Sequence, residues 1–405
     1  MKSRFLFFFL LYSAFSLAQI KIEGTVYNSE GVLEGAAVYL NNTMLGTTTD
    51  VNGKFILPVK IGQYDLIVSY LGYKKINYSL NTSSYSKPLV FALEEEENTL
   101  DEIVIKKIVY DDEWKYNFKT FRNEFIGRND LAKDCKILNP KDVYFNYNKK
   151  TNTLKAFTKK PLKIKHKSLG YLITYELESF IRNKNYITYL GYSKYEELKG
   201  GKRKQKLWKK NRKKAYNGSQ IHFYKSILNN TFSSEGFIVN QFKRVPNPKR
   251  PSEDEIKKAR QLLLLNRGLM IDFSKKITIP KNALDSALVT VRKSRLPKFA
   301  DYLYRSKLKK EEIITFKNNV YHLTFDNNLS IVYTREKEEM GYITRNVFSK
   351  KRKPLSQTSS IIPLNKKIIL DITGVLVNPL DVIYEGYWSY EKFASSLPLD
   401  YVPNN

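Results

Sequence analysis

Three histidines, His166, His222 and His322, are the side chains of this 405-residue chain whose ordinary pKa suits proton transfer near neutrality, and they also suit metal binding. None of them begins the His-x-x-Glu or His-Glu-x-x-His spacing with which a zinc peptidase presents ligands from one helix face. The sequence therefore predicts no metal site and no cofactor.

Cys135 is the single cysteine, so no intramolecular disulfide can form. A nucleophilic pair with His222 would need support from a local signature, and the chain has neither such a signature nor a Gly-x-Ser-x-Gly elbow nor a phosphate-binding loop. We expect Cys135 to be a small buried apolar residue. We expect His222 and His322, which stand in apolar, strand-like stretches, to be structural.

Glu176 and Glu178 lie two residues apart in a predicted strand and therefore share one face. Paired carboxylates could hydrolyse a glycoside, but in a chain of net charge +29 we expect them to pair with lysines. The sequence thus predicts no catalytic residues and a protein that is not an enzyme. The alternative is an envelope hydrolase with an unrecognised active site in the C-terminal module, which would need a pocket where these groups converge.

The N-terminus is built like a cleavable secretory peptide. Lys2 and Arg4 precede an almost wholly apolar run over residues 5–15, and Ser16-Leu17-Ala18 places small residues before a cut at Gln19. The run is too short to span a membrane, and no cysteine follows the cut to carry a lipid. We predict a signal peptide at residues 1–18 and an exported protein, in the periplasm or associated with the outer membrane.

Charge divides the chain unevenly. Residues 20–105 hold 6 Lys and Arg against 11 Asp and Glu, whereas residues 106–405 hold 61 against 29. This change in net charge predicts a domain boundary near the acidic run at residues 94–97, which we interpret as a solvated linker. Export argues against nucleic acid as the partner, so anionic lipid headgroups or polysaccharide are the expected anions. Codon usage in an AT-rich genome would produce the same lysine excess.

The densest basic run is Lys199–Lys214, with ten Lys or Arg in sixteen residues and no acid. We interpret it as a loop between two strands, either solvated and mobile or in contact with phosphate or lipid headgroups, with Trp208 at an interface. The candidate anion-contacting residues are Lys202, Arg203, Lys204, Lys206, Trp208, Lys209, Lys210, Arg212, Lys213 and Lys214.

Residues 20–93 consist of short alternating strands separated by turn residues, which is typical of a β-sandwich. The stretch Asp50-Val51-Asn52-Gly53 has strong turn chemistry, because Asp accepts hydrogen bonds from its own backbone and Gly tolerates positive φ. Asp50 and Asn52 could suggest calcium, but the further carboxylates of a calcium loop are missing.

This region resembles the carboxypeptidase-regulatory-like domain, a transthyretin-like sandwich of exported Bacteroidota proteins. The resemblance rests on four stretches: residues 24–26 (GTV), 35–38 (GAAV), 49–55 (TDVNGKF) and 68–73 (VSYLGY). Val32 stands where the family usually has proline. The resemblance implies a non-catalytic domain that precedes outer-membrane receptors, peptidases or unassigned modules, and so it indicates the envelope but no activity.

The remaining chain alternates between helix and strand signals. Aromatic residues from Trp114 to Phe125 predict a helix over residues 113–124, and residues 143–198 predict an antiparallel meander. Ser252 and Glu255 predict a capping box that opens a helix ending near Gly268. Residues 320–333 predict a hairpin and residues 368–377 a strand, before a short closing segment at residues 387–388.

This second region resembles a Bacteroidota family of unknown function that often follows the regulatory-like domain. The matching stretches are residues 125–127, 135–140, 169–171, 212–223 and 397–403. The resemblance implies architecture and envelope location only.

The predicted fold class is mainly β, with a transthyretin-like or immunoglobulin-like sandwich at residues 19–105 and a larger, basic, β-rich α+β module at residues 106–405. We expect the sandwich to dock onto an envelope protein through its loops or a sheet edge. The basic module would associate with anionic material. The sequence leaves the oligomeric state and the identity of the partner open.

Overall fold

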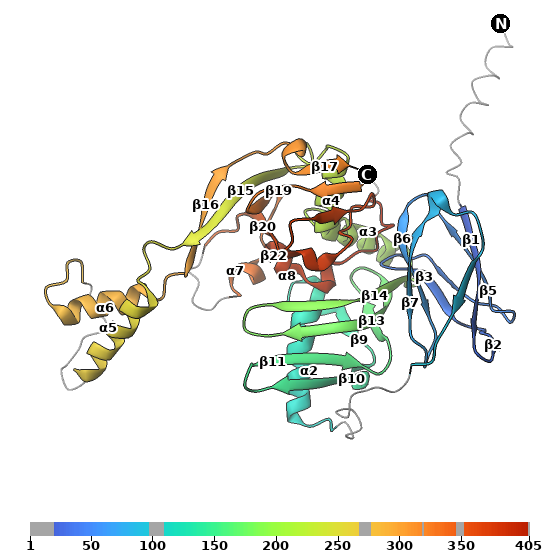
Figure 1. The fold of residues 1–405 in the computed structure, drawn as a ribbon, viewed down its shortest axis with the longest axis horizontal. Helices are drawn as coiled ribbons and strands as arrows, with labels where there is room; N and C mark the ends of the chain where they lie inside the picture. Colours follow the sequence, from blue (N-terminus) through green and yellow to red (C-terminus); the bar gives the residue numbers. More distant parts are fainter. Residues whose placement is uncertain (1–19, 97–108, 267–276, 318–319, 346–351, 404–405) are drawn as a thin grey trace, which may run out of the picture.

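The computed structural model describes residues 20–96, 109–266, 277–317, 320–345 and 352–403, and the predicted signal peptide lies outside them. Figure 1 shows a β-sandwich at one end, a β-rich body in the middle and a helical arm at the other end. No helix in the described part of the chain is both long and apolar enough to cross a membrane.

The N-terminal sandwich consists of two small sheets around one apolar core, as predicted. In the first sheet β1 (Ile20–Asn28) pairs with β2 (Gly31–Val32), β5 (Lys54–Val59) and β8 (Leu89–Ala92). The second sheet has the order β4 (Gly46–Thr48), β3 (Ala37–Leu40), β6 (Gln63–Ser69), β7 (Ile76–Asn81). Ile22 and Val26 on β1 are fully buried, so the alternating pattern does face a core.

The turn at Asp50 has the predicted chemistry. Its Oδ1 accepts hydrogen bonds from the backbone N–H groups of Asn52 and Lys54, each at 2.9 Å, and Gly53 has a φ of +68°. The carboxylate is thus used by the turn itself. Glu94 and Glu96 of the acidic run are exposed and hydrogen-bond through their backbones to Lys74 and Gly72 of the sandwich.

The body begins with α2 (Asp112–Phe125), the predicted aromatic helix, which packs on a six-stranded antiparallel sheet. The strands are β9 (Cys135–Ile137), β10 (Val143–Asn148), β11 (Thr153–Thr158), β12 (Leu162–His166), β13 (Tyr171–Arg182) and β14 (Ile187–Glu197). The Phe121 ring lies 4.9 Å from the Phe180 ring, and Phe125 stacks at 4.8 Å on Phe393 from the C-terminal segment. Aromatic contacts therefore join helix, sheet and C-terminus into one core.

The sheet is not the simple meander that the sequence suggested. β14 pairs along one edge of the long β13, while the other edge is shared by β12 and β11. β12 pairs on its far side with β9, a strand that precedes the region of the predicted meander. Local alternation cannot reveal this pairing, because it depends on where a distant segment returns.

The upper body has a second core between a five-stranded and a three-stranded sheet. The five-stranded sheet has the order β16 (Phe299–Arg305), β15 (Phe237–Pro246), β19 (Asn328–Lys337), β20 (Ser356–Pro363), β22 (Val382–Gly386). The three-stranded sheet consists of β17 (Ile314–Lys317), β18 (Val320–Leu323) and β21 (Ile368–Leu370). Two short helices, α7 (Met340–Ile343) and α8 (Tyr387–Glu391), complete this part.

Two sequence predictions fail in the upper body. β18 and β19 do not form a hairpin, because β18 pairs with β17 and β21 while β19 pairs with β15 and β20. The turn near Asn327, whose φ is +58°, instead carries the chain from one sheet to the other. The strand predicted over residues 368–377 ends at Leu370, where a turn containing Gly374 (φ +86°) follows.

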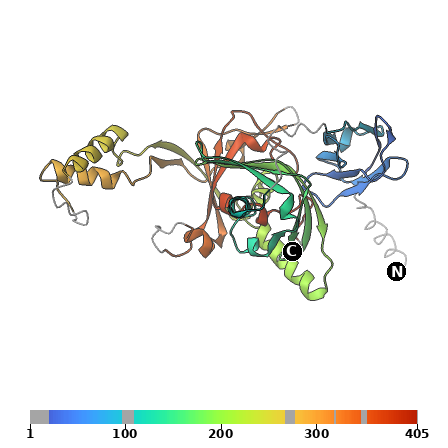
Figure 2. The ribbon, with the colours of Figure 1, turned by 90° about the horizontal axis from the view of Figure 1, so that it is seen from below.

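The arm carries α5 (Glu253–Leu265) and α6 (Ala283–Lys293) on the extended strands β15 and β16 (Figures 1 and 2). The predicted capping box is present, with Ser252 and Glu255 satisfying each other's backbone groups. The predicted stop at Gly268 lies outside the described residues. The two helices share a small core that includes Leu263 and Leu288.

The sandwich is joined to the central sheet by backbone hydrogen bonds and by one buried carboxylate. The Asn42 N–H donates to the Ser193 carbonyl at 2.8 Å, and the Tyr195 N–H donates to the Thr43 carbonyl at 2.9 Å, so the β3–β4 loop adds to β14 as a short parallel segment. Backbone pairing of this kind fixes the orientation of the sandwich on the body.

Glu176 of β13 is the buried carboxylate. Its carboxylate accepts hydrogen bonds from the Tyr39 hydroxyl at 2.7 Å and from Ser69 at 3.3 Å, and its Oε2 lies 3.5 Å from Lys75 Nζ. Lys75 also pairs with the more exposed Glu178. The expectation that this acidic pair serves lysines is confirmed, although the lysine comes from the sandwich.

We predict that Glu176→Ala lowers the free energy of unfolding by about 2 kcal/mol, because the buried Tyr39 hydroxyl loses its acceptor. Glu178→Ala should cost less than about 1 kcal/mol, since the pair that it breaks is solvent-exposed. Urea unfolding of the two variants beside the unmodified protein measures the difference. Equal losses would show that burial of Glu176 does not hold the interface.

Candidate functional site

The basic run forms a helix and not the loop that the sequence suggested. α3 spans Lys202–Tyr216 and is followed by α4 (Gln220–Leu228). The buried residues Trp208, Arg212 and Ala215 are spaced four and three apart, so they share one face of α3. This spacing is a helical signal in the sequence, but it includes only two apolar residues and is hidden among the lysines.

Trp208 and Arg212 fasten α3 to the β12–β13 turn. The Trp208 indole Nε1 donates to the Lys167 carbonyl at 2.8 Å, and the Arg212 Nε donates to the Leu169 carbonyl at 2.7 Å. The Arg212 guanidinium also pairs with Glu197 and lies 4.0 Å from the centre of the Tyr171 ring. Trp208 is therefore a buried packing residue, and the prediction that it settles at an interface is wrong.

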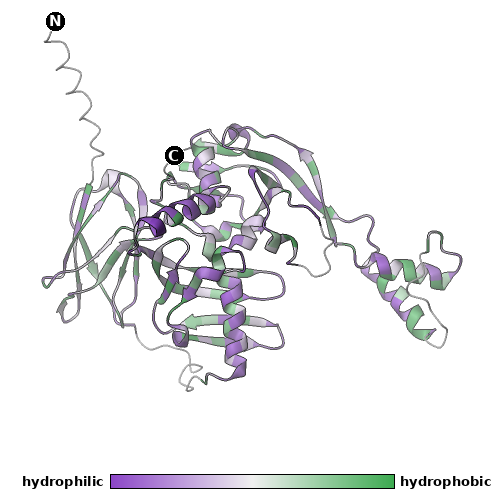
Figure 3. Cartoon of the chain, turned by 180° about the vertical axis from the view of Figure 1, so that it is seen from behind, coloured by the Kyte–Doolittle hydropathy of each residue, from purple (hydrophilic) through white to green (hydrophobic). Residues whose placement is uncertain are grey.

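The other eight predicted contact residues are exposed on α3: Lys202, Arg203, Lys204, Lys206, Lys209, Lys210, Lys213 and Lys214. We call them the cationic face of α3. Lys214 lies 3.4 Å from Glu339. Within the described parts of the chain, no carboxylate lies within 4 Å of any of the other seven. Figure 3 shows α3 as a strongly hydrophilic helix beside the sandwich, and Figure 2 shows it on the outside of the body.

Gly170 lies in the β12–β13 turn directly against the Trp208 ring of α3. A Cβ at this position would lie 2.3 Å from the Trp208 ring, and its φ is +74°. We predict that Gly170→Ala lowers the free energy of unfolding by about 1–3 kcal/mol through overpacking and backbone strain. Gly201→Ala at the start of the same helix should be near neutral, because nothing lies within 4 Å of a Cβ there. Chemical denaturation of both variants checks this, and equal stability would contradict the packing described for Trp208.

The groups that a hydrolase would have needed do not come together. Cys135 is buried in the central core, and burial raises the pKa of its thiol to about 12. His222 lies in α4, not in a strand as the sequence suggested. Its Nδ1 accepts from the Gly218 N–H at 3.0 Å and its Nε2 donates to Glu235 at 2.6 Å. The Glu176 carboxylate is bound to side chains of the sandwich. A hydrolase site built from Cys135, His222 and the Glu176/Glu178 pair is therefore not supported.

The remaining histidines are separate from one another. The Nε2 of the buried His166 donates to the Ala394 carbonyl at 2.9 Å, and burial lowers its pKa. His322 is half-buried on β18. The described residues contain no group of three or more His, Cys, Asp or Glu side chains that could hold a metal ion.

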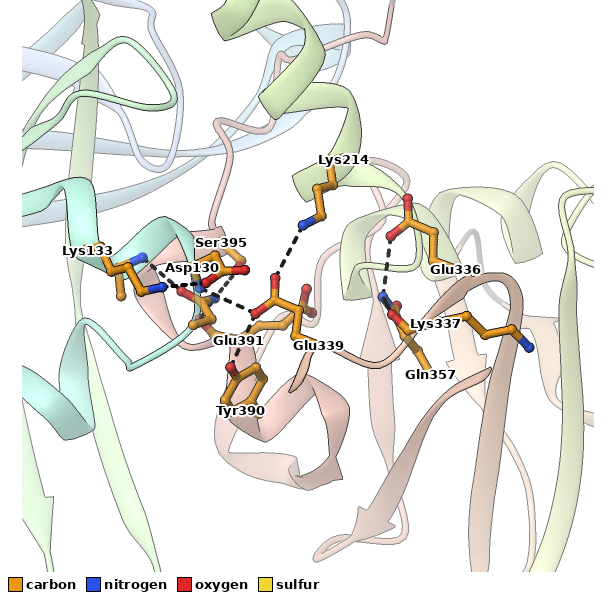
Figure 4. Close-up of polar contacts among 12 residues, drawn as sticks. Asp130, Lys133, Lys214, Glu336, Lys337, Glu339, Gln357, Tyr390, Glu391 and Ser395 are labelled. Atoms are coloured by element: carbon orange, nitrogen blue, oxygen red, sulfur yellow. Dashed lines mark hydrogen bonds and ion pairs between the residues drawn. The ribbon is translucent and has the colours of Figure 1, made fainter. Parts of the chain in front are cut away.

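A cluster of charged side chains, Asp130, Lys214, Glu339 and Glu391, lies where α7 and α8 meet the central core (Figure 4). It was not predicted from the sequence. Glu339 accepts hydrogen bonds from the Asp130 N–H at 3.3 Å and the Tyr390 hydroxyl at 3.2 Å, and it pairs with Lys214. Glu391 lies beside it. Burial, together with the negative charge of Glu339, raises the pKa of Glu391 to about 8. No local motif marks the cluster, because its members come from four distant segments.

We predict that Glu391 makes stability fall as pH rises from about 5 to about 8. Its carboxyl is protonated in the folded protein over this range but ionised in the unfolded chain, so folding takes up a proton. The loss is at most about 5 kcal/mol, and less where water reaches this partly exposed group. Glu391→Gln should remove that slope and be more stable than the unmodified protein above pH 8.

Thermal unfolding of both proteins across this pH range measures the effect. The buried His166 and His222, whose pKa values are lowered, give a slope of the opposite sign in both proteins. The difference between the two curves therefore isolates Glu391. Parallel curves would contradict a raised pKa.

A cavity of about 470 Å³ lies where the sandwich, α3, α4 and the C-terminal segment meet. Its lining includes Tyr64 and Asp65 from the sandwich, Tyr216 at the end of α3, Gln220 at the start of α4, and Glu391. The volume lies within the range of small-molecule sites. This cavity could not be predicted from the sequence, because its walls come from segments far apart in the chain.

The fold and these sites define a protein in which an all-β N-terminal domain is fixed to a larger β-rich body with an exposed cationic helix. Comparison with known families shows that residues 22–105 are a CarboxypepD_reg-like domain. A curated relative, TonB-dependent receptor P39 of Formosa agariphila, is 31% identical over 101 residues, which are 24% of this chain and 9% of the receptor.

The family match confirms the resemblance seen in the N-terminal motifs. Both matches concern the N-terminal part of the chain, and the resemblance of the body to a family of unknown function stays a prediction. The recognised domain is the non-catalytic, regulatory-like one.

Proposed function

We propose that the protein is an exported, non-catalytic protein of the cell envelope that associates with anionic envelope material through the cationic face of α3. The single observation that carries the proposal is a helix without any acidic residue, whose exposed lysines and arginine, apart from Lys214, have no carboxylate partner in the described chain. The similarity of the N-terminal domain to part of a TonB-dependent receptor supports the envelope location.

The attachment of α3 to the body holds its positive charges on one fixed surface, where they can act on the same anionic ligand. Because Trp208 and Arg212 hold one side of the helix against the β12–β13 turn, the cationic side chains project from a fixed support. Each Lys or Arg near an anionic lipid surface contributes about 1 kcal/mol. Several acting together would give a reversible, salt-sensitive association, since exposed charges are screened over about 10 Å at ordinary ionic strength.

The sandwich supplies a docking surface in this proposal. Its β3–β4 loop is already occupied by β14 of the same chain, so a partner would use the opposite sheet, formed by β1, β2, β5 and β8. Ile56 on β5 and Val90 on β8 are 56% and 67% exposed there. Crosslinking in intact cells would identify the envelope protein captured by this sheet, and Ile56→Lys and Val90→Lys should reduce the capture.

We predict that replacing Lys209, Lys210 and Lys213 together by Gln weakens binding to phosphatidylglycerol vesicles by roughly tenfold to a hundredfold, the loss of about 1 kcal/mol per charge at most. Binding by the unmodified protein should fall steeply with added salt. Arg212 is left unchanged, because it is buried and its removal would test folding instead of binding.

The matched control replaces three exposed lysines at the turns of the central sheet, Lys149, Lys150 and Lys184, by Gln. This variant carries the same net charge and should bind as the unmodified protein does. Vesicle cosedimentation and the same assay with polygalacturonate distinguish lipid from acidic polysaccharide. If both triple variants lose binding equally, net charge and not α3 is responsible, and the proposal fails.

A further inference from the structure

We propose that the cavity between the sandwich and the body is a binding site for a neutral carbohydrate of about disaccharide size. The match of residues 22–105 to a known domain does not assign a ligand to this cavity, and most of the residues that line it belong to the body. The site is independent of the cationic face of α3, so either proposal can fail without the other.

The first argument is the aromatic character of the walls. Tyr64, Tyr216, Tyr384 and Trp388 all line the cavity. The polar ends of two of them are already used, since the Tyr384 hydroxyl lies 2.9 Å from that of Tyr224 and the Trp388 Nε1 donates to the Gly218 carbonyl at 2.7 Å. Rings fixed by such bonds offer rigid apolar surfaces, which suit the apolar faces of sugar rings.

The second argument is a set of hydrogen-bonding groups without partners. The side chains of Gln63 and Asp65 lie two apart on β6 and therefore share one face, and Gln220 opens α4 across the cavity. None of these three side chains makes a hydrogen bond to another of the described residues. An amide offers both donors and acceptors and a carboxylate offers acceptors, which is the combination that clustered hydroxyl groups require.

The third argument is that the inner wall disfavours charge. Burial raises the pKa of Glu391 and Asp371 and lowers the pKa of Lys392, so each group is shifted towards its neutral form. A strongly anionic ligand would also face Asp65. An acyl chain would leave the amides and the carboxylate desolvated and unpaired, which is costly. A neutral ligand rich in hydroxyl groups satisfies all these conditions.

The test is titration of the full chain with four neutral disaccharides: maltose, cellobiose, lactose and N,N′-diacetylchitobiose. Calorimetry measures affinity, and tryptophan fluorescence reports on Trp388 in the cavity wall. We expect at least one of the four to saturate at millimolar concentration or below. Saturation by none, or saturation only by dodecanoate or galacturonate, would overturn the proposal.

Variants then locate the site. Asp65→Ala and Gln220→Ala should each weaken binding about tenfold, the loss expected for one hydrogen bond of about 1–2 kcal/mol. Glu23→Ala and Gln205→Ala are the matched controls, because both residues are exposed and neither lines the cavity. Circular dichroism confirms that each variant is folded. Unchanged binding in both cavity variants would place the sugar elsewhere and overturn the assignment, whereas the α3 triple variant should bind the sugar normally.

Discussion

The buried Glu176 carboxylate is the contact on which the arrangement of the molecule depends. It lies on the longest strand of the central sheet and is held by a hydroxyl, a serine and a lysine from the sandwich. A buried charge is tolerated only when its partners are correctly placed, so this interaction allows one orientation of the sandwich. The backbone pairing of the β3–β4 loop with β14 supports the same orientation. The cavity depends on this orientation, because Tyr64 and Asp65 of the sandwich form part of its wall.

The two cores of the body are rich in packed aromatic side chains. The chain has one cysteine, which is buried and unpaired, so no disulfide contributes. Phe125 contacts both Tyr175 of the central sheet and Phe393 of the C-terminal segment, at 5.0 and 4.8 Å between ring centres. The last described residues thus complete the central core and also line the cavity. This shared use explains why binding groups and packing groups lie side by side there.

Several elements could be predicted because their signals are local. The Asp50 turn, the capping box of α5 and the aromatic face of α2 each depend on residues within one or two turns of chain. The buried face of α3 is hard to recognise from the sequence, because one of its three residues is an arginine, Arg212. Arginine becomes buried here because the ends of a turn supply carbonyl acceptors and Tyr171 supplies a ring. The prediction of a hairpin at residues 320–333 is wrong because the pairing of these strands is set by distant segments, β15 for β19 and β21 for β18.

The sandwich fold of the N-terminal domain and the concentration of positive charge in one short run can be predicted from the sequence, because each depends on neighbouring residues. The helical form of that run with its buried side, the role of Glu176 at an interface and the cavity appear only in the folded chain. Burial depends on what the rest of the chain brings close, so a carboxylate, an arginine or a tyrosine acquires its role from partners tens or hundreds of residues away.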